Sequence, residues 1–91
     1  MSAIDWAYPA EFLEQLLTHG LAPAPATPPA LVREALSDLY RFEIRRLRER
    51  LRGGQVEKAD YVDEVVALRK KYWLLSLTPS AWEDICRGVA S

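Results

Sequence analysis

The chain has 91 residues, of which 49% are apolar, and its formal net charge is -1. This length suits one domain and leaves no room for a second hydrophobic core. The apolar content excludes a disordered chain, and the near-neutral charge argues against a dedicated nucleic-acid binder, although it is compatible with a local basic patch.

Cysteine and histidine are scarce, since Cys86 and His19 are the only residues of their kinds. A single cysteine forms no intrachain disulfide, and a zinc site usually needs several Cys or His ligands. Cys86 lies on an apolar helical stripe without a basic cluster beside it, so we expect a buried thiol rather than a nucleophile. We therefore expect a protein that is not an enzyme, with no catalytic residues, no cofactor and no metal ion.

No stretch of the sequence approaches the ~20 apolar residues that a membrane-spanning helix needs. Asp5, Glu11 and Glu14 interrupt the N-terminal region in which a signal peptide would carry its apolar run. A cytoplasmic protein is therefore expected, and the unpaired Cys86 agrees with a reducing compartment.

The first predicted helix covers about residues 9–19. Pro9 suits the first helical position, where its missing N–H would have no partner in any case. Phe12 and Leu16 repeat at helical spacing, and Gly20 can adopt the left-handed conformation that ends a helix. Residues 21–29 then contain four prolines, which forbid a helix and favour an extended, semi-rigid connector.

Three more helices are expected, over about residues 29–52, 58–76 and 80–89. Pro29 suits the first turn of the long helix, and the pair Gly53 and Gly54 ends it. Ser80 and Glu83 have the spacing of a capping box, which predicts the start of the last helix at that point.

The long helix changes character along its length. Its first half is apolar over about half of its circumference and must contact more than one neighbour, whereas its second half keeps a narrow stripe that includes Ile44 and Leu47. The short Gly-rich turn forces this helix and the next to run antiparallel. In the register that matches the apolar stripes, Leu47 faces Val65, and Tyr40 faces Tyr72. The predicted fold is all-α: a single domain in which a small bundle of four helices is built on a long antiparallel helical hairpin.

Glu43 and Arg69 are charged residues within the apolar arcs of the two hairpin helices, at matching heights. A single buried charge is costly, so two opposite charges at one height are expected to form an ion pair across the hairpin. The alternative is that both side chains extend outward at the edge of the contact and keep their charges in water.

Arginines dominate the second half of the long helix, and four of them share one face: Arg41, Arg45, Arg48 and Arg52. A helix that follows a phosphate backbone would use this spacing, so a nucleic-acid-binding module is one interpretation. The favoured interpretation is a solvated, internally balanced surface, because the start of the next helix is acidic and faces the arginines. Aromatic residues, apart from Phe42, do not alternate with the arginines as base-stacking platforms would.

Four apolar residues are candidates for a protein-interaction surface: Trp6, Tyr8, Phe42 and Leu74. Trp6 and Tyr8 precede the first helix, where they either attach that helix to the core or remain available to a partner. Phe42 lies at the edge of its helix, and Leu74 points away from the main apolar face. Apolar residues that lie away from the main apolar face of their helix often mark a binding site in a small domain, although single exposed apolar residues are also common.

The sequence thus predicts a non-catalytic protein-interaction module, a small accessory or assembly subunit that acts through apolar helix surfaces. Its expected partner is another protein or a second copy of the chain, as in a homodimer. The alternative is a helical module that binds nucleic acid through the arginine face. Neither a membrane nor a metal ion is expected as a partner.

Overall fold

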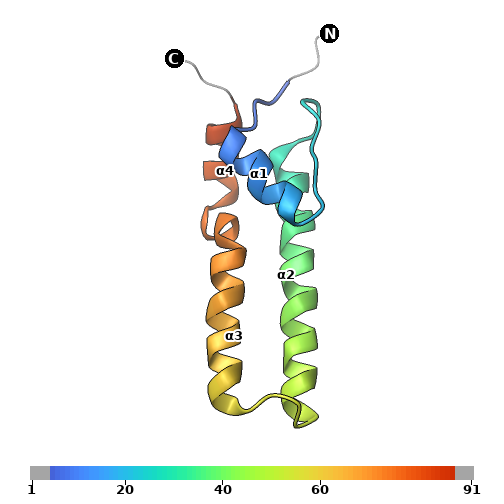
Figure 1. Cartoon of the computed structure of the whole chain (residues 1–91). Coiled ribbons are helices and arrows are strands. Elements are labelled where there is room, and N and C mark those ends of the chain that lie inside the picture. The colour runs from blue at the N-terminus through green and yellow to red at the C-terminus, as the bar shows by residue number, and fades with distance from the viewer. Residues whose placement is uncertain (1–4, 88–91) are drawn as a thin grey trace.

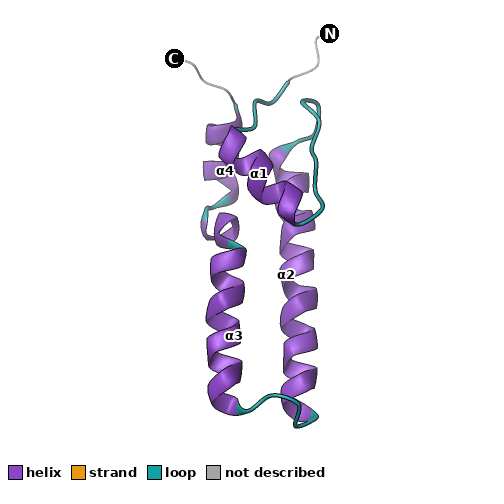
Figure 2. Cartoon of the chain, viewed as in Figure 1, coloured by secondary structure: helices purple, strands orange, loops and turns teal. Residues whose placement is uncertain are grey.

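The computed structural model describes residues 5–87, and every regular element within that range is helical (Figure 2). The α-helices cover Ala10–Thr18 (α1), Pro29–Arg52 (α2), Lys58–Lys71 (α3) and Pro79–Cys86 (α4), and a short 3-10 helix (η1) covers Trp73–Ser76. The predicted all-α bundle on an antiparallel hairpin is confirmed. Residues 88 and 89, expected at the end of the last helix, lie outside the described residues.

The molecule is elongated, because α2 and α3 run side by side far beyond the other helices (Figure 1). Its extents are 56 × 22 × 20 Å and its radius of gyration is 16.0 Å, whereas a compact chain of this length would have a radius of about 12 Å. We call the crowded end the head, which consists of α1, η1, α4 and residues 29–39 of α2. The projecting hairpin, residues 40–71, is the arm.

Glycines in the left-handed conformation end the first two helices. Gly20 has φ +78°, and the backbone N–H of Leu21 donates to the Leu16 carbonyl at 2.9 Å. Gly54 has φ +74°, and the N–H of Gln55 donates to the Arg50 carbonyl at 2.9 Å. Both are Schellman-type ends, which only a residue tolerant of positive φ forms without strain. The second of them turns the chain at the tip of the arm.

The head holds the main hydrophobic core, which gathers buried side chains from all of its elements: Phe12, Leu16, Val32, Leu36, Tyr72, Leu74, Trp82 and Cys86. Trp82 is fully buried, and its indole N–H donates to the Leu74 carbonyl at 2.9 Å. Burial raises the pKa of the Cys86 thiol, which agrees with the expected buried, unreactive cysteine.

The helix expected over residues 58–76 is shorter than predicted, because the chain leaves the α-helical path at Tyr72. The tight turn of η1 then directs Leu74 into the core, where it is only 2% exposed. The Arg33 guanidinium donates to the carbonyls of Leu75 and Leu77 at 3.1 and 3.0 Å, which supplies partners that a continued helix would have provided. The prediction that Leu74 belongs to an interaction surface is therefore wrong.

The segment before α1 is attached to the head. The backbone N–H of Trp6 donates to the Pro25 carbonyl at 2.7 Å, and the Tyr8 hydroxyl donates to the Thr27 carbonyl. Both aromatic side chains are partly buried against the core. Burial, together with the nearby Cys86, raises the pKa of Tyr8 to about 12. Of the two alternatives for Trp6 and Tyr8, the structure favours attachment of the first helix.

The start of α4 differs from the predicted capping box. Thr78 precedes the helix, and its hydroxyl accepts a hydrogen bond from the Ala81 N–H at 3.1 Å. Pro79 occupies the first helical position, so the helix begins before Ser80. None of the helices between residues 5 and 87 is both long enough and apolar enough to cross a bilayer.

Candidate functional site

The arm consists of two helices, and among residues 5–87 no third helix packs along their length. This arrangement determines which side chains the arm can bury. Leu47 is buried at the contact between α2 and α3, which we call the seam, and Val56 is buried under the turn at the tip. No residue of α3 is fully buried. One partner covers only one side of a helix, so both flanks of the seam stay open.

Expected contacts across the seam are only partly present. Tyr40 and Tyr72 lie opposite each other, with their ring centroids 5.3 Å apart, as the predicted register requires. Glu43, however, pairs with Lys71 at 3.2 Å and accepts a hydrogen bond from the Tyr72 hydroxyl. The predicted pairing of Glu43 with Arg69 is wrong, because the two residues line opposite flanks of the seam.

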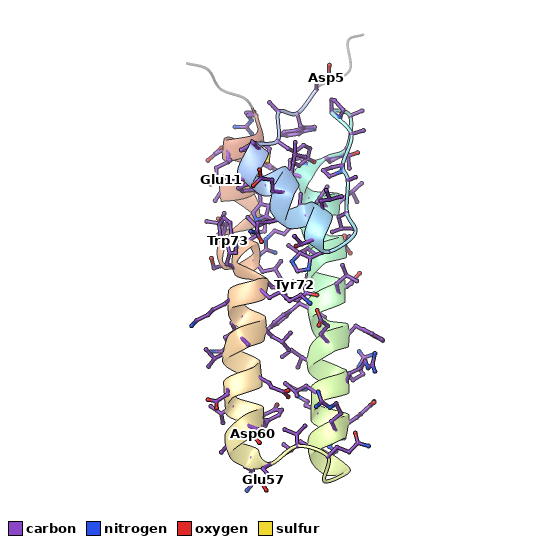
Figure 3. The ribbon with its side chains drawn as sticks, in the orientation of Figure 1. Asp5, Glu11, Glu57, Asp60, Tyr72 and Trp73 are labelled. Atoms are coloured by element: carbon purple, nitrogen blue, oxygen red, sulfur yellow. The ribbon has the colours of Figure 1, made fainter. Side chains whose placement is uncertain are left out.

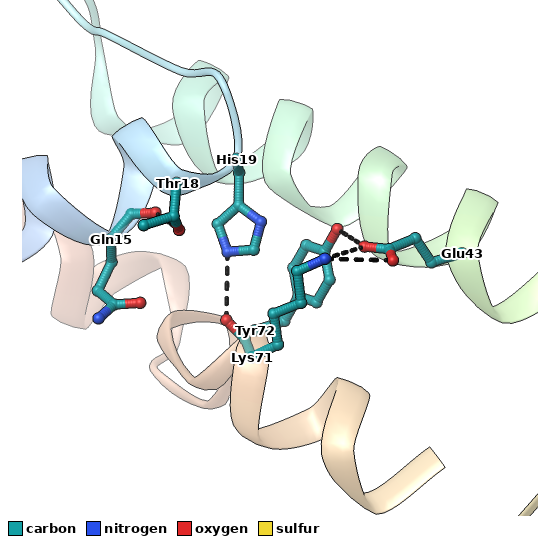
Figure 4. A network of polar contacts seen from close by, with 6 residues as sticks. All are labelled: Gln15, Thr18, His19, Glu43, Lys71 and Tyr72. Carbon is teal, nitrogen blue, oxygen red and sulfur yellow. Dashed lines mark hydrogen bonds and ion pairs between the residues drawn. The ribbon is translucent and has the colours of Figure 1, made fainter. Parts of the chain in front are cut away.

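The contacts of Glu43 belong to a network at the junction of head and arm (Figure 4). His19, at the end of α1, stacks on the Tyr72 ring with centroids 4.3 Å apart, and its Nε2 lies 3.2 Å from the Lys71 carbonyl oxygen. The network therefore connects α1, α2 and the end of α3. Figure 3 shows Tyr72 and Trp73 at this junction, with Glu57 and Asp60 at the far tip.

Charges in this network shift two pKa values. Partial burial acts to raise the pKa of Glu43, but the hydrogen bonds from Tyr72 and Lys71 and the positive charge of Lys71 outweigh it, so the net shift is downward. Burial and the neighbouring Glu43 carboxylate both raise the pKa of Tyr72. The network thus favours an ionised Glu43 and a neutral Tyr72.

We expect Glu43→Gln to lower the free energy of unfolding at pH 7 by about 1 kcal/mol, because it weakens charge-assisted hydrogen bonds. A carboxyl whose pKa is lower in the folded state stabilises the protein above its unfolded pKa, near 4.5, and this contribution is lost as the pH falls through the folded value. The difference between Glu43→Gln and the parent, measured by urea unfolding at pH 7 and pH 3, should therefore shrink at pH 3.

Asp38→Asn is the matched control, since Asp38 also pairs with a cation, Arg41, but both side chains are about two-thirds exposed. It should change the stability little at either pH. Equal effects of the two substitutions at pH 7 would contradict the assigned role of Glu43.

On one flank of the seam lies a groove of about 640 Å³ that we call the arginine groove. Its floor is apolar and comes from both helices: Tyr40, Ile44, Tyr61, Val62, Val65 and Val66. Its charged lining consists of arginines alone: Arg41, Arg45 and Arg48 from α2, and Arg69 from α3. Within the described part of the chain, no aspartate or glutamate lines it. Three residues of the predicted arginine face therefore meet at one site, whereas Arg52 lies outside it.

Ion pairs involve only some of the arginines of the arm. Arg41 pairs with Asp38 at 3.1 Å, and Arg50 lies 3.7 Å from Glu64 on the other flank. Within residues 5–87, Arg45, Arg48 and Arg69 form no ion pair. Three of the four arginines that line the arginine groove are thus without an ion pair, in a chain whose net charge is -1.

On the opposite flank lies a smaller groove of about 370 Å³, which we call the balanced groove. Its charged lining has both signs: Glu43, Arg46, Arg50, Glu64 and Lys71. Phe42, Leu47, Ala67 and Leu68 provide its apolar part. Phe42 is 53% exposed, with the Arg46 guanidinium 5.8 Å from its ring centroid. Phe42 is therefore accessible, as an interaction residue has to be.

Comparisons with known protein families, curated proteins and solved structures find no significant match to this chain. Its function has to be inferred from the geometry of the arm. The described residues include no group of three or more His, Cys, Asp or Glu side chains that could hold a metal ion.

Sequence reasoning did not identify Arg69 as part of the arginine face. Arg69 lies on α3, and it joins the three arginines of α2 only through the packing of the two helices. Its position within the apolar arc of α3 is the available signal, but that signal alone predicts an ion pair with Glu43 equally well.

Proposed function

We propose that this protein is a non-catalytic protein-interaction module, an accessory or assembly subunit whose arm binds another protein or a second copy of the chain. The proposal rests on one observation, the exposure of apolar side chains on both flanks of the seam. Val62 and Phe42, on opposite flanks, are each more than half exposed, at 58% and 53%. Neighbouring apolar side chains along a two-helix arm are typical of a surface that a partner covers.

Photo-crosslinking in the cells that make the protein tests this proposal. A photoreactive amino acid at Val62 or Phe42 should form adducts with a polypeptide, because both positions lie on the arm. Leu17 and Leu31 are the matched controls, since they are exposed apolar residues of the head, at 67% and 59%. Adducts in equal yield from the head positions, or none from either arm position, would contradict the proposal.

Self-association is expected to use the balanced groove. Its two carboxylates and three cations can pair across a two-fold axis, and Phe42 can enter the same groove of the second copy. Sedimentation should therefore detect a dimer that Phe42→Asp converts into a monomer. Leu31→Asp, which adds the same charge to an exposed leucine of the same helix, should leave the dimer intact. A monomer at millimolar concentration, or a dimer unaffected by Phe42→Asp, would be evidence against this interface.

Nucleic acid is the second candidate partner, and the arginine groove is the observation that favours it. Binding to a single-stranded oligonucleotide through these arginines should weaken by orders of magnitude between about 50 and 200 mM salt. Arg45→Glu combined with Arg48→Glu should abolish it. Binding that persists in the double variant, or that does not depend on salt, would reject this candidate.

A further inference from the structure

The arginine groove combines an apolar floor with a positively charged lining, in which every charged residue is an arginine. Arg41 already pairs with Asp38, but Arg45, Arg48 and Arg69 form no ion pair within residues 5–87. Guanidinium groups that face one groove without a carboxylate partner repel each other and gain from an anionic ligand. An occupant that satisfies both properties needs an apolar stripe for the floor and carboxylates beside it for the arginines.

We infer that the arginine groove binds an acidic amphipathic helix of a partner protein. This inference rests on the proposed function and specifies its partner. Two neighbouring helices leave a groove that a third helix fills in ordinary helix packing. A helix also brings a backbone whose hydrogen bonds are already made, whereas an extended segment needs a sheet edge, and the described arm consists of helices and a turn.

The spacing of the arginines defines the pattern of the partner. Arg41, Arg45 and Arg48 repeat at intervals of four and three along α2, so carboxylates at the same intervals on a neighbouring helix can face them. The stretch from Arg41 to Arg48 is about 10 Å long, or two helical turns. Apolar residues at positions i, i+3, i+4 and i+7 of the partner would cover Val62 and Val66, which are exposed on the floor.

A second copy of the chain is a poor occupant of this groove. Two copies related by a two-fold axis through it would bring eight arginines together, from the four that line each groove, and like charges at an interface cost several kcal/mol. The lining of the balanced groove has charges of both signs, so two copies can meet there with opposite charges facing each other.

Nucleic acid matches the charge of the groove but not its floor. Bases bind by stacking on aromatic faces, and most of the floor is aliphatic. Of its two tyrosines, Tyr40 packs edge-on against Tyr72, with centroids 5.3 Å apart. Tyr61 is the remaining aromatic residue of the floor. An aliphatic floor favours leucine and isoleucine side chains over bases.

A peptide titration of the full chain tests the inference. The probe is a peptide of about 18 residues with leucine at i, i+3, i+4 and i+7 and glutamate beside them, crosslinked on its outer face so that the helix is preformed. One control peptide has the same composition with the leucines spread around the helix, and a second carries lysine in place of glutamate. Fluorescence anisotropy gives the affinity, and amide chemical shifts locate the site.

We expect the acidic amphipathic peptide to bind at least about tenfold more tightly than either control peptide. Arg45→Glu with Arg48→Glu should weaken its binding by more than about tenfold, and so should Val62→Asp, because both the charges and the floor contribute. Arg46→Glu with Arg50→Glu is the matched control, since it reverses two arginines of the balanced groove; it should leave the affinity within about twofold.

Equal binding of the peptide with scattered leucines would overturn the inference, because charge alone would then explain the affinity. Tighter binding of a single-stranded oligonucleotide, lost in the Arg45→Glu, Arg48→Glu variant, would overturn it in favour of nucleic acid. A peptide that does not bind overturns the acidic-helix assignment only, provided that the arm still forms adducts with a polypeptide. Loss of those adducts, in contrast, overturns the proposed function itself.

Discussion

Replacing Trp82 with alanine is expected to lower the free energy of unfolding by about 3–5 kcal/mol. Trp82 is fully buried, lies edge-on to Phe12 with ring centroids 5.1 Å apart, and donates its indole N–H to the Leu74 carbonyl. The substitution leaves a large cavity and removes one of the two hydrogen bonds that the Leu74 carbonyl accepts, the other coming from the backbone N–H of Leu77. Because a domain of this size is stable by only about 5–10 kcal/mol, much of its stability should be lost. Urea unfolding followed by far-ultraviolet ellipticity measures the effect.

Trp73→Ala is the matched control for this prediction. Trp73 is 37% exposed and touches the same Phe12 ring from farther away, with centroids 6.5 Å apart. Its replacement by alanine should lower the free energy of unfolding by about 1 kcal/mol, because the side chain is partly exposed. Equal costs for the two tryptophans would show that the core of the head is not organised around Trp82.

Leu47→Ala is expected to have the second-largest effect and to lower the free energy of unfolding by about 2–3 kcal/mol. Leu47 is buried at the seam of the arm and lies outside the core of the head. Its removal should loosen the contact between α2 and α3. Far-ultraviolet ellipticity, to which these two helices contribute most, should then change at lower urea concentration than the tryptophan fluorescence, since Trp6, Trp73 and Trp82 all lie outside the arm.

Val62→Ala is the control on the opposite helix of the arm, because Val62 is mostly exposed. It should change the stability by less than about 0.5 kcal/mol. A similar loss from Val62→Ala and Leu47→Ala would indicate that a further element covers the flank of the arm on which Val62 lies.

Several features of the fold could be predicted from the sequence because local rules determine them. The glycine-terminated end of α2 and the short turn that follows it require an antiparallel hairpin with α3. The apolar stripes set its register, and the opposed rings of Tyr40 and Tyr72 agree with it. The change from a broad to a narrow apolar face along α2 corresponds to the division into head and arm.

The break at Tyr72 was not predictable, because the helical apolar pattern continues beyond it and no proline occurs before Pro79. The interactions that stabilise the break are remote in sequence. Arg33 binds the carbonyls of Leu75 and Leu77 from a different helix. Propensity is a weak guide where such tertiary contacts decide the backbone path.

Part of the candidate site was predictable from the sequence, because helical periodicity determines it. Periodicity places Arg41, Arg45 and Arg48 on one face of a helix. It does not define which side of a neighbouring helix that face meets, since this depends on how the second helix is rotated about its own axis. The rotation of α3 brings Lys71 to Glu43 and Arg69 to the arginine groove, so a Glu43–Lys71 pair forms in place of the predicted Glu43–Arg69 pair.

Hydrogen exchange along α2 tests the central claim most directly, because this one continuous helix is covered from several sides in the head and from one side in the arm. In the monomeric chain, amides of residues 33–39 should exchange at least about tenfold more slowly than those of residues 44–51. Equal protection along the whole helix, or greater protection in the arm, would contradict an arm whose flanks are open to a partner.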